Sequence, residues 1–298
     1  MKQLLLFFLL SIPAFAQKSF LVKDSSTNEP IAYTSVFTEN GTFKVNAEPD
    51  GSFTIPNEFL HEIFVFDAVG YEAKQQLLTD IVLLETKSEV LDEVVIVSSL
   101  GTKEIKVGSV KKSEQKTGFG AGSIENNWRF GRFFNYNKEI ESHPFLKDVS
   151  FRLDARQKVA TYAVKIYEAD EQGFPAELLH DELIIGKIEK RKKISKIDLQ
   201  SYNIMIPKNG IVVVFEWLTI ESNYYEIEYY SEEDKKTKKT KGYNPIILAS
   251  TTADKKQSLI KYHVVTKDKW ENITQDFLLK HIEKGSYPLI MCELTLTN

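Results

Sequence analysis

The stretch Ile211-Val212-Val213-Val214-Phe215-Glu216-Trp217 decides the fold class of this chain. Six of its seven residues are apolar and four are β-branched, a composition that favours a strand over a helix. Since apolar residues occupy both parities of the strand, neither face is set aside for solvent. The stretch therefore predicts a central β-strand that is buried on both faces.

Segments with strand periodicity lie on both sides of this stretch, from about residue 126 to residue 298. In one of them, Tyr162 and Val164 fall on one face by alternation while Lys165 falls on the other. The expected strands are 128–134, 149–153, 161–168, 194–199, 211–219, 224–230, 246–250, 259–264 and 289–296. About nine strands over this length predict a larger, jelly-roll-like β-sandwich. One short helix is expected at residues 273–284, before the last strand.

Residues 18–97 show short strands that alternate with tight turns, and no long amphipathic helix. Asn40-Gly41 is a typical hairpin dipeptide, and Pro49-Asp50-Gly51 combines a preset φ at proline with tolerance of positive φ at glycine. About seven strands in this length predict a small β-sandwich.

Five short motifs occur in this segment in a fixed order. They are Val22-Lys23-Asp24, Glu29-Pro30-Ile31-Ala32-Tyr33-Thr34-Ser35-Val36, Asp50-Gly51-Ser52-Phe53, Val69-Gly70-Tyr71-Glu72 and Leu91-Asp92-Glu93-Val94-Val95-Ile96. Together they resemble the carboxypeptidase-regulatory-like domain, a family widespread in exported proteins of Bacteroidetes-type bacteria. The resemblance implies a transthyretin-like, or prealbumin-like, seven-stranded sandwich. In that sandwich we expect Phe53 to fill the core and Gly70 to permit a turn that lets Tyr71 pack back.

That family serves as an accessory module on carboxypeptidases and at the front of TonB-dependent outer-membrane receptors. The resemblance covers about residues 18–97, and the rest of the chain is too short for a receptor plug and barrel. Residues 91–97 are expected to form a final strand, which could also dock a partner by edge pairing.

Between the two strand-rich regions, residues 98–125 are rich in glycine and lysine and poor in large apolar residues. This composition predicts a flexible linker. The glycines at 118, 120 and 122 do not form a nucleotide site, because the sequence lacks the final glycine of the dinucleotide fingerprint and the Lys-Ser/Thr ending of a P-loop. The expected organisation is a sandwich at 17–97, a linker at 98–125 and a β domain at 126–298.

The first sixteen residues indicate export. Lys2 precedes an apolar run at residues 4–12, and Ala14-Phe15-Ala16 forms a small-residue cleavage frame. This pattern predicts a signal peptide at residues 1–16 that is too short to span a membrane. No cysteine follows the frame for lipid attachment, and no later segment has membrane-spanning length. We expect an exported mature chain without a transmembrane span, periplasmic or associated with the cell surface or outer membrane.

Charge and cysteine content narrow the function classes. A net charge of -4 argues against nucleic-acid partners, which require a clustered excess of Lys and Arg. Lysines at 235–241 follow three acidic residues, so this segment predicts a solvated hairpin loop of mixed charge. Cys292 is the only cysteine, which excludes an intramolecular disulfide, and its apolar neighbours predict a buried side chain.

No catalytic or metal-binding motif stands out. Zinc carboxypeptidases present His-x-x-Glu with a distant His, but none of the five histidines here (His61, His143, His180, His263 and His281) is followed by Glu at the third position. The histidines at 61, 180 and 281 have carboxylate neighbours and are expected on the surface or in loops. The serine-hydrolase elbow is also absent. We therefore assign no catalytic residue, metal ligand or cofactor, although a pair of carboxylates remains possible in so charged a chain.

Exposed aromatic residues are the best binding candidates, since sandwich modules use them to stack on sugars or grip peptides. By strand parity Tyr224 and Tyr230 share one face and Tyr225 and Tyr229 the other, so one pair is expected outside. The six candidates are Trp128, Tyr224, Tyr225, Tyr229, Tyr230 and Trp270. The alternative is that they are ordinary core residues.

The sequence as a whole favours a non-catalytic exported envelope protein whose β modules bind a protein or glycan partner. The alternative is a hydrolase, such as a divergent carboxypeptidase or glycan-active enzyme, with a site in the second domain. A cluster of histidine and carboxylates in a deep pocket would favour the hydrolase.

Overall fold

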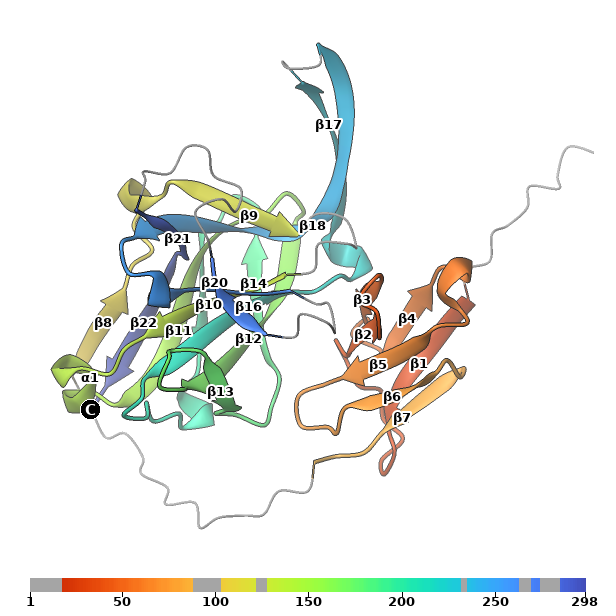
Figure 1. Cartoon of the computed structure of the whole chain (residues 1–298), viewed down its shortest axis with the longest axis horizontal. Helices are drawn as coiled ribbons and strands as arrows, with labels where there is room; N and C mark the ends of the chain where they lie inside the picture. Colours follow the sequence, from red (N-terminus) through yellow and green to blue (C-terminus); the bar gives the residue numbers. More distant parts are fainter. Residues whose placement is uncertain (1–17, 88–102, 122–127, 232–234, 263–268, 274–284) are drawn as a thin grey trace, which may run out of the picture.

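The computed structural model describes residues 18–87, 103–121, 128–231, 235–262, 269–273 and 285–298. These residues form an all-β protein with four sheets, mostly antiparallel, and one short α-helix (Figure 1). The signal peptide at 1–16, the strand at 91–97 and nearly all of the helix at 273–284 are expectations that lie outside the described residues.

The N-terminal body, residues 18–87, contains seven strands in two sheets, as the turn pattern predicted. They are β1 (Lys18–Asp24), β2 (Ser35–Thr38), β3 (Lys44–Asn46), β4 (Ser52–Ile55), β5 (Ile63–Asp67), β6 (Lys74–Leu77) and β7 (Ile81–Leu84). One sheet has the order β4-β1-β7 and the other β3-β2-β5-β6. Phe53 is buried in the core between them.

Two glycines explain why the N-terminal turns close. Gly51 has φ +77° and Gly70 has φ +83°, a region that L side chains rarely adopt. After Gly70 the chain turns so that Tyr71 packs against the core, and its hydroxyl donates to Asp24 Oδ2 at 3.1 Å. The core position expected for Phe53 and the turn expected at Gly70 are both confirmed.

The larger body contains the remaining elements. They are β8 (Glu104–Gly108), β9 (Thr117–Ala121), β10 (Trp128–Phe134), α1 (Lys138–Ser142), β11 (Phe145–Asp154), β12 (Val159–Ala169), β13 (Pro175–Leu178), β14 (Ile184–Glu189), β15 (Ile194–Asp198), β16 (Ile211–Trp217), β17 (Tyr224–Ser231), β18 (Lys236–Thr252), β19 (Ser258–Tyr262), β20 (Trp270–Asn272), β21 (Tyr287–Ile290) and β22 (Cys292–Thr297). Helix α1 begins where the Asn137 side chain accepts hydrogen bonds from the backbone of Glu139 and Ile140.

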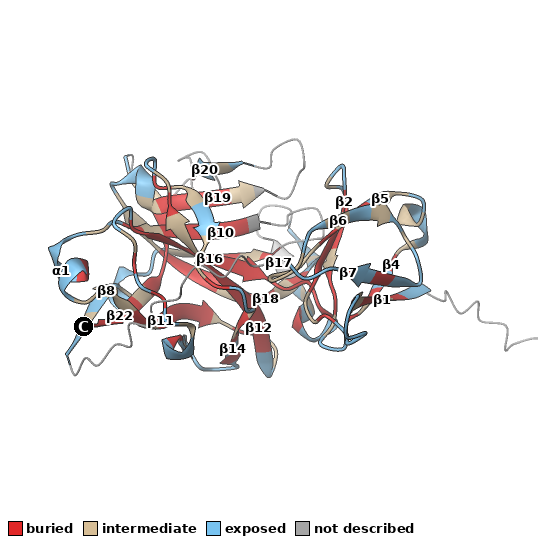
Figure 2. Ribbon diagram, turned by 90° about the horizontal axis from the view of Figure 1, so that it is seen from below, coloured by how far each residue is buried: buried red, intermediate tan, exposed pale blue. Residues whose placement is uncertain are grey.

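Two strongly curled sheets enclose the core of the larger body. One has the order β13-β12-β16-β10-β19-β20, with β14 on β12; we call it the β16 sheet. The other has the order β17-β18-β11-β22-β8, with β15, β21 and β9 attached. Buried strands run through both bodies in Figure 2. Cys292 is fully buried in this core, as expected.

Strand β16 is central, as its sequence predicted. All seven of its residues are buried, and it pairs with β12 on one side and β10 on the other. Its Phe215 side chain packs in the core between the curled sheets. Its Glu216 side chain lies on the opposite face, toward the N-terminal body.

The expectation of a flexible linker is wrong for residues 103–121. Strand β8 pairs with β22, and β9 pairs with β18. The physical reason is burial: Ile105 and Val107 pack against the core of the larger body, and Phe119 is a buried member of it. The larger body also has more strands than the nine expected, because short strands such as β13, β14 and β20 lack a long alternating pattern.

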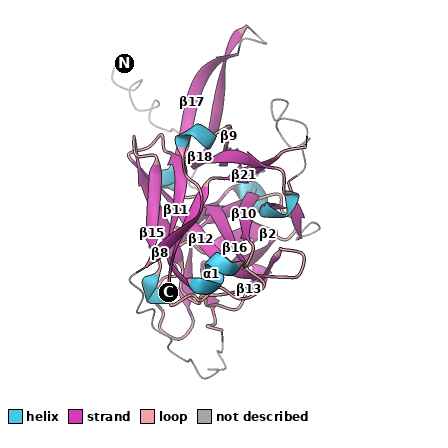
Figure 3. Cartoon of the chain, turned by 90° about the vertical axis from the view of Figure 1, so that its left-hand side faces the viewer, coloured by secondary structure: helices cyan, strands magenta, loops and turns pink. Residues whose placement is uncertain are grey.

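The lysine-rich segment, expected as a loop, is a strand from Lys236 onward, with Lys235 in the turn before it. Residues 236–242 of β18 pair with β17 to form a two-stranded ribbon, which stands out from the body (Figures 1 and 3). Opposite charges face each other across the two strands, since Lys239 lies 3.7 Å from Glu226 and 3.2 Å from Glu228. Cross-strand pairing of these charges allows a strand where the lysine run alone indicated a loop.

Candidate functional site

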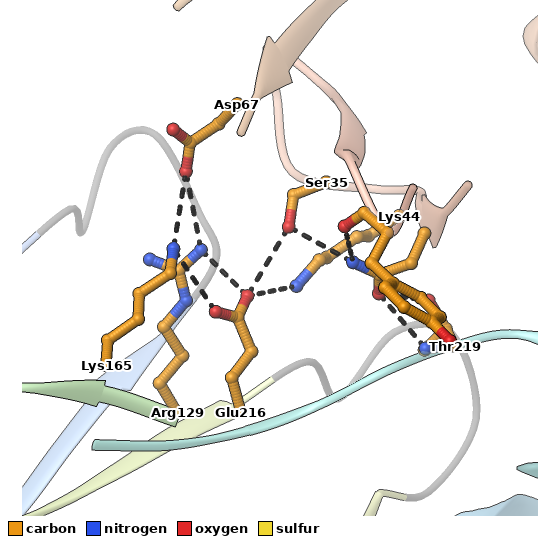
Figure 4. A network of polar contacts seen from close by, with 9 residues as sticks. Ser35, Lys44, Asp67, Arg129, Lys165, Glu216 and Thr219 are labelled. Atoms are coloured by element: carbon orange, nitrogen blue, oxygen red, sulfur yellow. Dashed lines mark hydrogen bonds and ion pairs between the residues drawn. The ribbon is translucent and has the colours of Figure 1, made fainter. Parts of the chain in front are cut away.

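Five charged side chains meet at the junction of the two bodies, between the β3-β2-β5-β6 sheet and the outer face of the β16 sheet (Figure 4). The N-terminal body contributes two of them and the larger body three. The members of this junction cluster are Lys44, Asp67, Arg129, Lys165 and Glu216. Three cations therefore face two carboxylates.

Glu216 is the centre of the junction cluster. Its Oε1 accepts from Lys44 Nζ at 3.1 Å and lies 2.9 Å from Arg129 Nη2, while its Oε2 lies 3.4 Å from Lys165 Nζ. The residue is only 2% exposed. A buried carboxylate is tolerated when it is paired, and this one has three cations around it.

Asp67 is held more loosely. Its Oδ2 lies 3.7 Å from Arg129 Nη2 and 3.9 Å from Lys165 Nζ, both longer than a direct hydrogen bond. Its side chain is 35% exposed. Burial acts to raise the pKa of Asp67, but the charges of Lys165 and Arg129 outweigh it and hold this pKa below its ordinary value. Asp67 is therefore an ionised, partly open member of the cluster.

Donors in the cluster exceed the acceptors that reach them. Arg129 is 6% exposed, and its Nε and Nη2 make no hydrogen bond within the described residues, so its contact with Glu216 is an ion pair alone. Lys165 is 7% exposed and has three N–H donors, with its two carboxylate contacts at 3.4 and 3.9 Å. Buried donors without acceptors are costly, so Arg129 carries an energetic cost that its ion pair with Glu216 must offset.

Lys44 is the most deeply buried cation of the cluster. Burial lowers the pKa of Lys44 to about 8; Glu216 acts to raise it, and the positive charge of Arg129 lowers it further. The side chain comes from β3, where Val45 packs into the N-terminal core while its two neighbours point to the junction. Strand alternation thus places Lys44 and Asn46 side by side on the face that meets the larger body.

A cleft of about 470 Å³ lies beside the cluster and is lined by both bodies. Asp67, Lys165 and Glu216 line its polar part. Tyr33 and Tyr71 come from the N-terminal body. Its volume falls in the range of small-molecule sites.

Tyr33 has an unusual backbone at the edge of this cleft. Its φ is +58°, which is rare for an aromatic residue. The conformation is fixed by two hydrogen bonds, from Tyr33 N to Ala47 O at 3.1 Å and from Asn46 Nδ2 to Tyr33 O at 3.1 Å. Its ring packs against apolar residues of the larger body, including Leu218. Strained residues held this way cluster at functional sites.

His180 lies in the loop between β13 and β14, which fits the expectation of a surface or loop histidine, but its side chain is buried rather than exposed. Its Nε2 accepts from Ile166 N at 3.1 Å, and its Nδ1 lies 2.7 Å from Glu182 O. Burial lowers the pKa of His180. Because both ring nitrogens are engaged with backbone, this histidine is a structural residue rather than a base or a ligand. His61 is exposed, and His263 and His281 lie outside the described residues.

The six aromatic binding candidates are distributed over two sheets, and the three whose side chains the structure describes, Tyr224, Tyr225 and Trp270, do not line the cleft. Tyr224 is exposed, and Tyr225 is half-buried under Arg156, whose guanidinium carbon lies 5.1 Å from the ring centroid. Tyr229 and Tyr230 continue the same strand, β17. Trp128 begins β10, and Trp270 is half-buried in β20 against a small apolar cluster.

Sequence reasoning missed the junction cluster, although a signal was present. Lys165 and Glu216 each interrupt an apolar strand at a position with buried neighbours on both sides, and Arg129 directly precedes the buried Phe130. A charge in a buried strand needs a partner, but sequence alone does not show which one. The N-terminal partners, Lys44 and Asp67, are 172 and 149 residues away from Glu216.

Comparison of the chain with family models, curated proteins and solved structures finds no match. Among the described residues, no helix has the length and apolar character needed to cross a membrane. In the same part of the chain, no group of three or more His, Cys, Asp or Glu side chains is arranged to hold a metal ion.

Proposed function

We propose that this chain is a non-catalytic exported envelope protein, periplasmic or surface-associated, that binds a glycan or protein partner in the cleft between its two bodies. One observation carries the proposal: the cleft is built from both bodies and lies against a buried, donor-rich cluster. Sites between domains are common places for ligands. The envelope location rests on the expected signal peptide.

The architecture supports the same proposal. Seven strands in two sheets, with Gly51 and Gly70 at positive φ, suit a carboxypeptidase-regulatory-like module with a transthyretin-like fold. The two curled sheets of the larger body suit a jelly-roll-like sandwich. We place β8 and β9 with this larger domain.

Two groups that could supply acid–base or covalent chemistry, His180 and Cys292, are not available for it. His180 has both ring nitrogens engaged with backbone groups. Burial raises the pKa of Cys292 to about 12, so its thiol is not a ready nucleophile. These observations favour binding over hydrolysis.

The test is capture from envelope fractions by the immobilised mature chain, residues 17–298. Val69→Trp fills the cleft from its N-terminal wall, and Val159→Trp, at an exposed site outside the cleft, is the matched control. We expect a component that wild type and Val159→Trp retain and Val69→Trp loses, at equal melting temperatures. Retention that is equal for all three proteins, or chelator-sensitive peptide hydrolysis, would overturn the proposal.

A further inference from the structure

The cleft presents two opposed sets of hydrogen-bonding groups across a short gap. Asp67 Oδ2 stands on one side and Lys165 Nζ stands 3.9 Å away on the other, while Arg129 lies behind them and does not line the cleft. An ionised carboxylate only accepts hydrogen bonds, and ammonium and guanidinium groups only donate them. Neither side directly satisfies the other at this distance.

The gap discriminates between ligand groups. A ligand carboxylate or phosphate would be attracted to Lys165 but repelled by Asp67 and by Glu216 behind it. A ligand ammonium would meet the reverse problem at Lys165 and Arg129. A trans peptide group directs its N–H and C=O to opposite sides, so it does not offer both to one locus. A hydroxyl donates and accepts from a single oxygen and satisfies both sides at once.

The rest of the lining fits a ligand that carries many hydroxyls on an apolar ring. The cleft is lined by Tyr33 and Tyr71 together with apolar residues such as Ile31 and Leu183. Aromatic rings pack against the C–H faces of such rings while polar groups bind the edges. Four carboxylates and one lysine line the cleft, which disfavours an acidic ligand.

The shape indicates a chain-like ligand. A second hollow of about 520 Å³ adjoins the cleft and shares Gly70 and Asp181 with it. The combined volume of the two hollows exceeds what one sugar ring would fill, so an oligosaccharide is the better match.

We infer that the cleft binds a neutral oligosaccharide, with a sugar hydroxyl that bridges Asp67 and Lys165 from the cleft side. This inference rests on the proposed function and names its ligand class. Asp67 and Lys165 are then binding residues, and Glu216 positions Lys165.

The test uses isothermal titration of the mature chain with cellohexaose, maltohexaose, xylohexaose, mannohexaose and chitohexaose. Polygalacturonate and chitosan serve as the charged probes. We expect at least one neutral hexamer to bind, Asp67→Ala to weaken that binding at least tenfold, and Val69→Trp to abolish it. Glu228→Gln, on the exposed ribbon, is the matched control and should leave the affinity unchanged.

The outcomes separate the two proposals. Binding of a charged probe alone, no binding to any neutral hexamer, or binding that Asp67→Ala leaves intact would overturn the glycan inference. If envelope capture still depends on Val69 in those cases, the proposed function stands without its glycan ligand. The melting temperature of each variant distinguishes lost binding from lost folding. If Asp67→Ala has a lower melting temperature than wild type, Lys165→Met tests the same hydroxyl-binding pair from its other side.

Discussion

Asn46 and Thr219 are joined by three hydrogen bonds across the junction of the two bodies. Thr219 N and Oγ1 each donate to Asn46 Oδ1 at 3.0 Å, and Asn46 N donates to Thr219 O at 3.4 Å. The Asn46 amide also donates to Tyr33 O and Ser35 Oγ. All of the hydrogen-bonding groups of one buried side chain therefore serve to hold the bodies and the Tyr33 backbone in place.

Asn46→Ala should lower the free energy of unfolding by about 3 kcal/mol, because it leaves buried donors and acceptors on both bodies without partners. Urea denaturation measures this loss. Asn272→Ala, which removes one exposed hydrogen bond to Lys255 O, is the control and should cost less than about 1 kcal/mol. Equal costs for the two variants would contradict the role assigned to Asn46.

Because of Lys44, the free energy of unfolding should change with pH in the alkaline range. Its pKa is about 8 in the folded state, against an ordinary value of 10.5. Between these values the unfolded chain holds a proton that the folded chain has released, so the contribution of Lys44 to stability rises with pH. Relative to Lys44→Met, the wild-type free energy of unfolding should rise by about 2 kcal/mol from pH 8 to pH 10.

Urea denaturation of both proteins at pH 7, 8, 9 and 10 measures this difference. Other groups titrate in the same window, but they are common to the two proteins and cancel. Lys239→Met, on the exposed ribbon, is the matched control for the loss of a lysine side chain. A wild-type advantage that stays flat or falls with pH would show that Lys44 is not buried as a cation at neutral pH.

Gly51→Ala should be strongly destabilising for two separable reasons. The residue has φ +77°, and an added Cβ would lie 2.7 Å from Val22 O and 2.9 Å from Pro30 Cβ. Gly285 has φ +92° but nothing within 4 Å of an added Cβ, so Gly285→Ala reports the backbone cost alone. We expect about 1 kcal/mol for Gly285→Ala and at least twice that for Gly51→Ala, by urea denaturation. Equal losses would mean that the turn relaxes around the new methyl group.

The sequence predicted those elements whose determinants are local. The Asp50-Gly51 turn, the buried Phe53 and the central strand β16 follow from turn chemistry and apolar runs. Strands β8 and β9 were missed because their short, glycine-containing patterns become strands only by pairing with β22 and β18. Pairing between distant segments overrides local composition.

The candidate site was beyond prediction for a similar reason. Its five charged residues come from β3, β5, β10, β12 and β16, and only the packing of two bodies brings them together. A charged residue inside an apolar strand shows that a partner must exist. Its identity depends on which outer sheet face another body covers, and no periodicity encodes that.

Glu216→Gln tests whether this carboxylate is what allows three cations to be buried together. The substitution keeps the shape of the side chain but removes the charge that faces Lys44, Arg129 and Lys165. We expect the free energy of unfolding to fall by about 3–5 kcal/mol, the cost of breaking a buried ion pair on one side. Glu228→Gln, whose partner Lys239 is exposed, should cost less than about 1 kcal/mol.

The double variant Glu216→Gln with Lys44→Met should recover part of the loss, because it removes one uncompensated cation, and a coupling of at least 1 kcal/mol is expected. Strictly additive losses would mean that Lys44 and Glu216 are neighbours without mutual dependence, and the junction would then be held mainly by Asn46 and the apolar contacts around Tyr33.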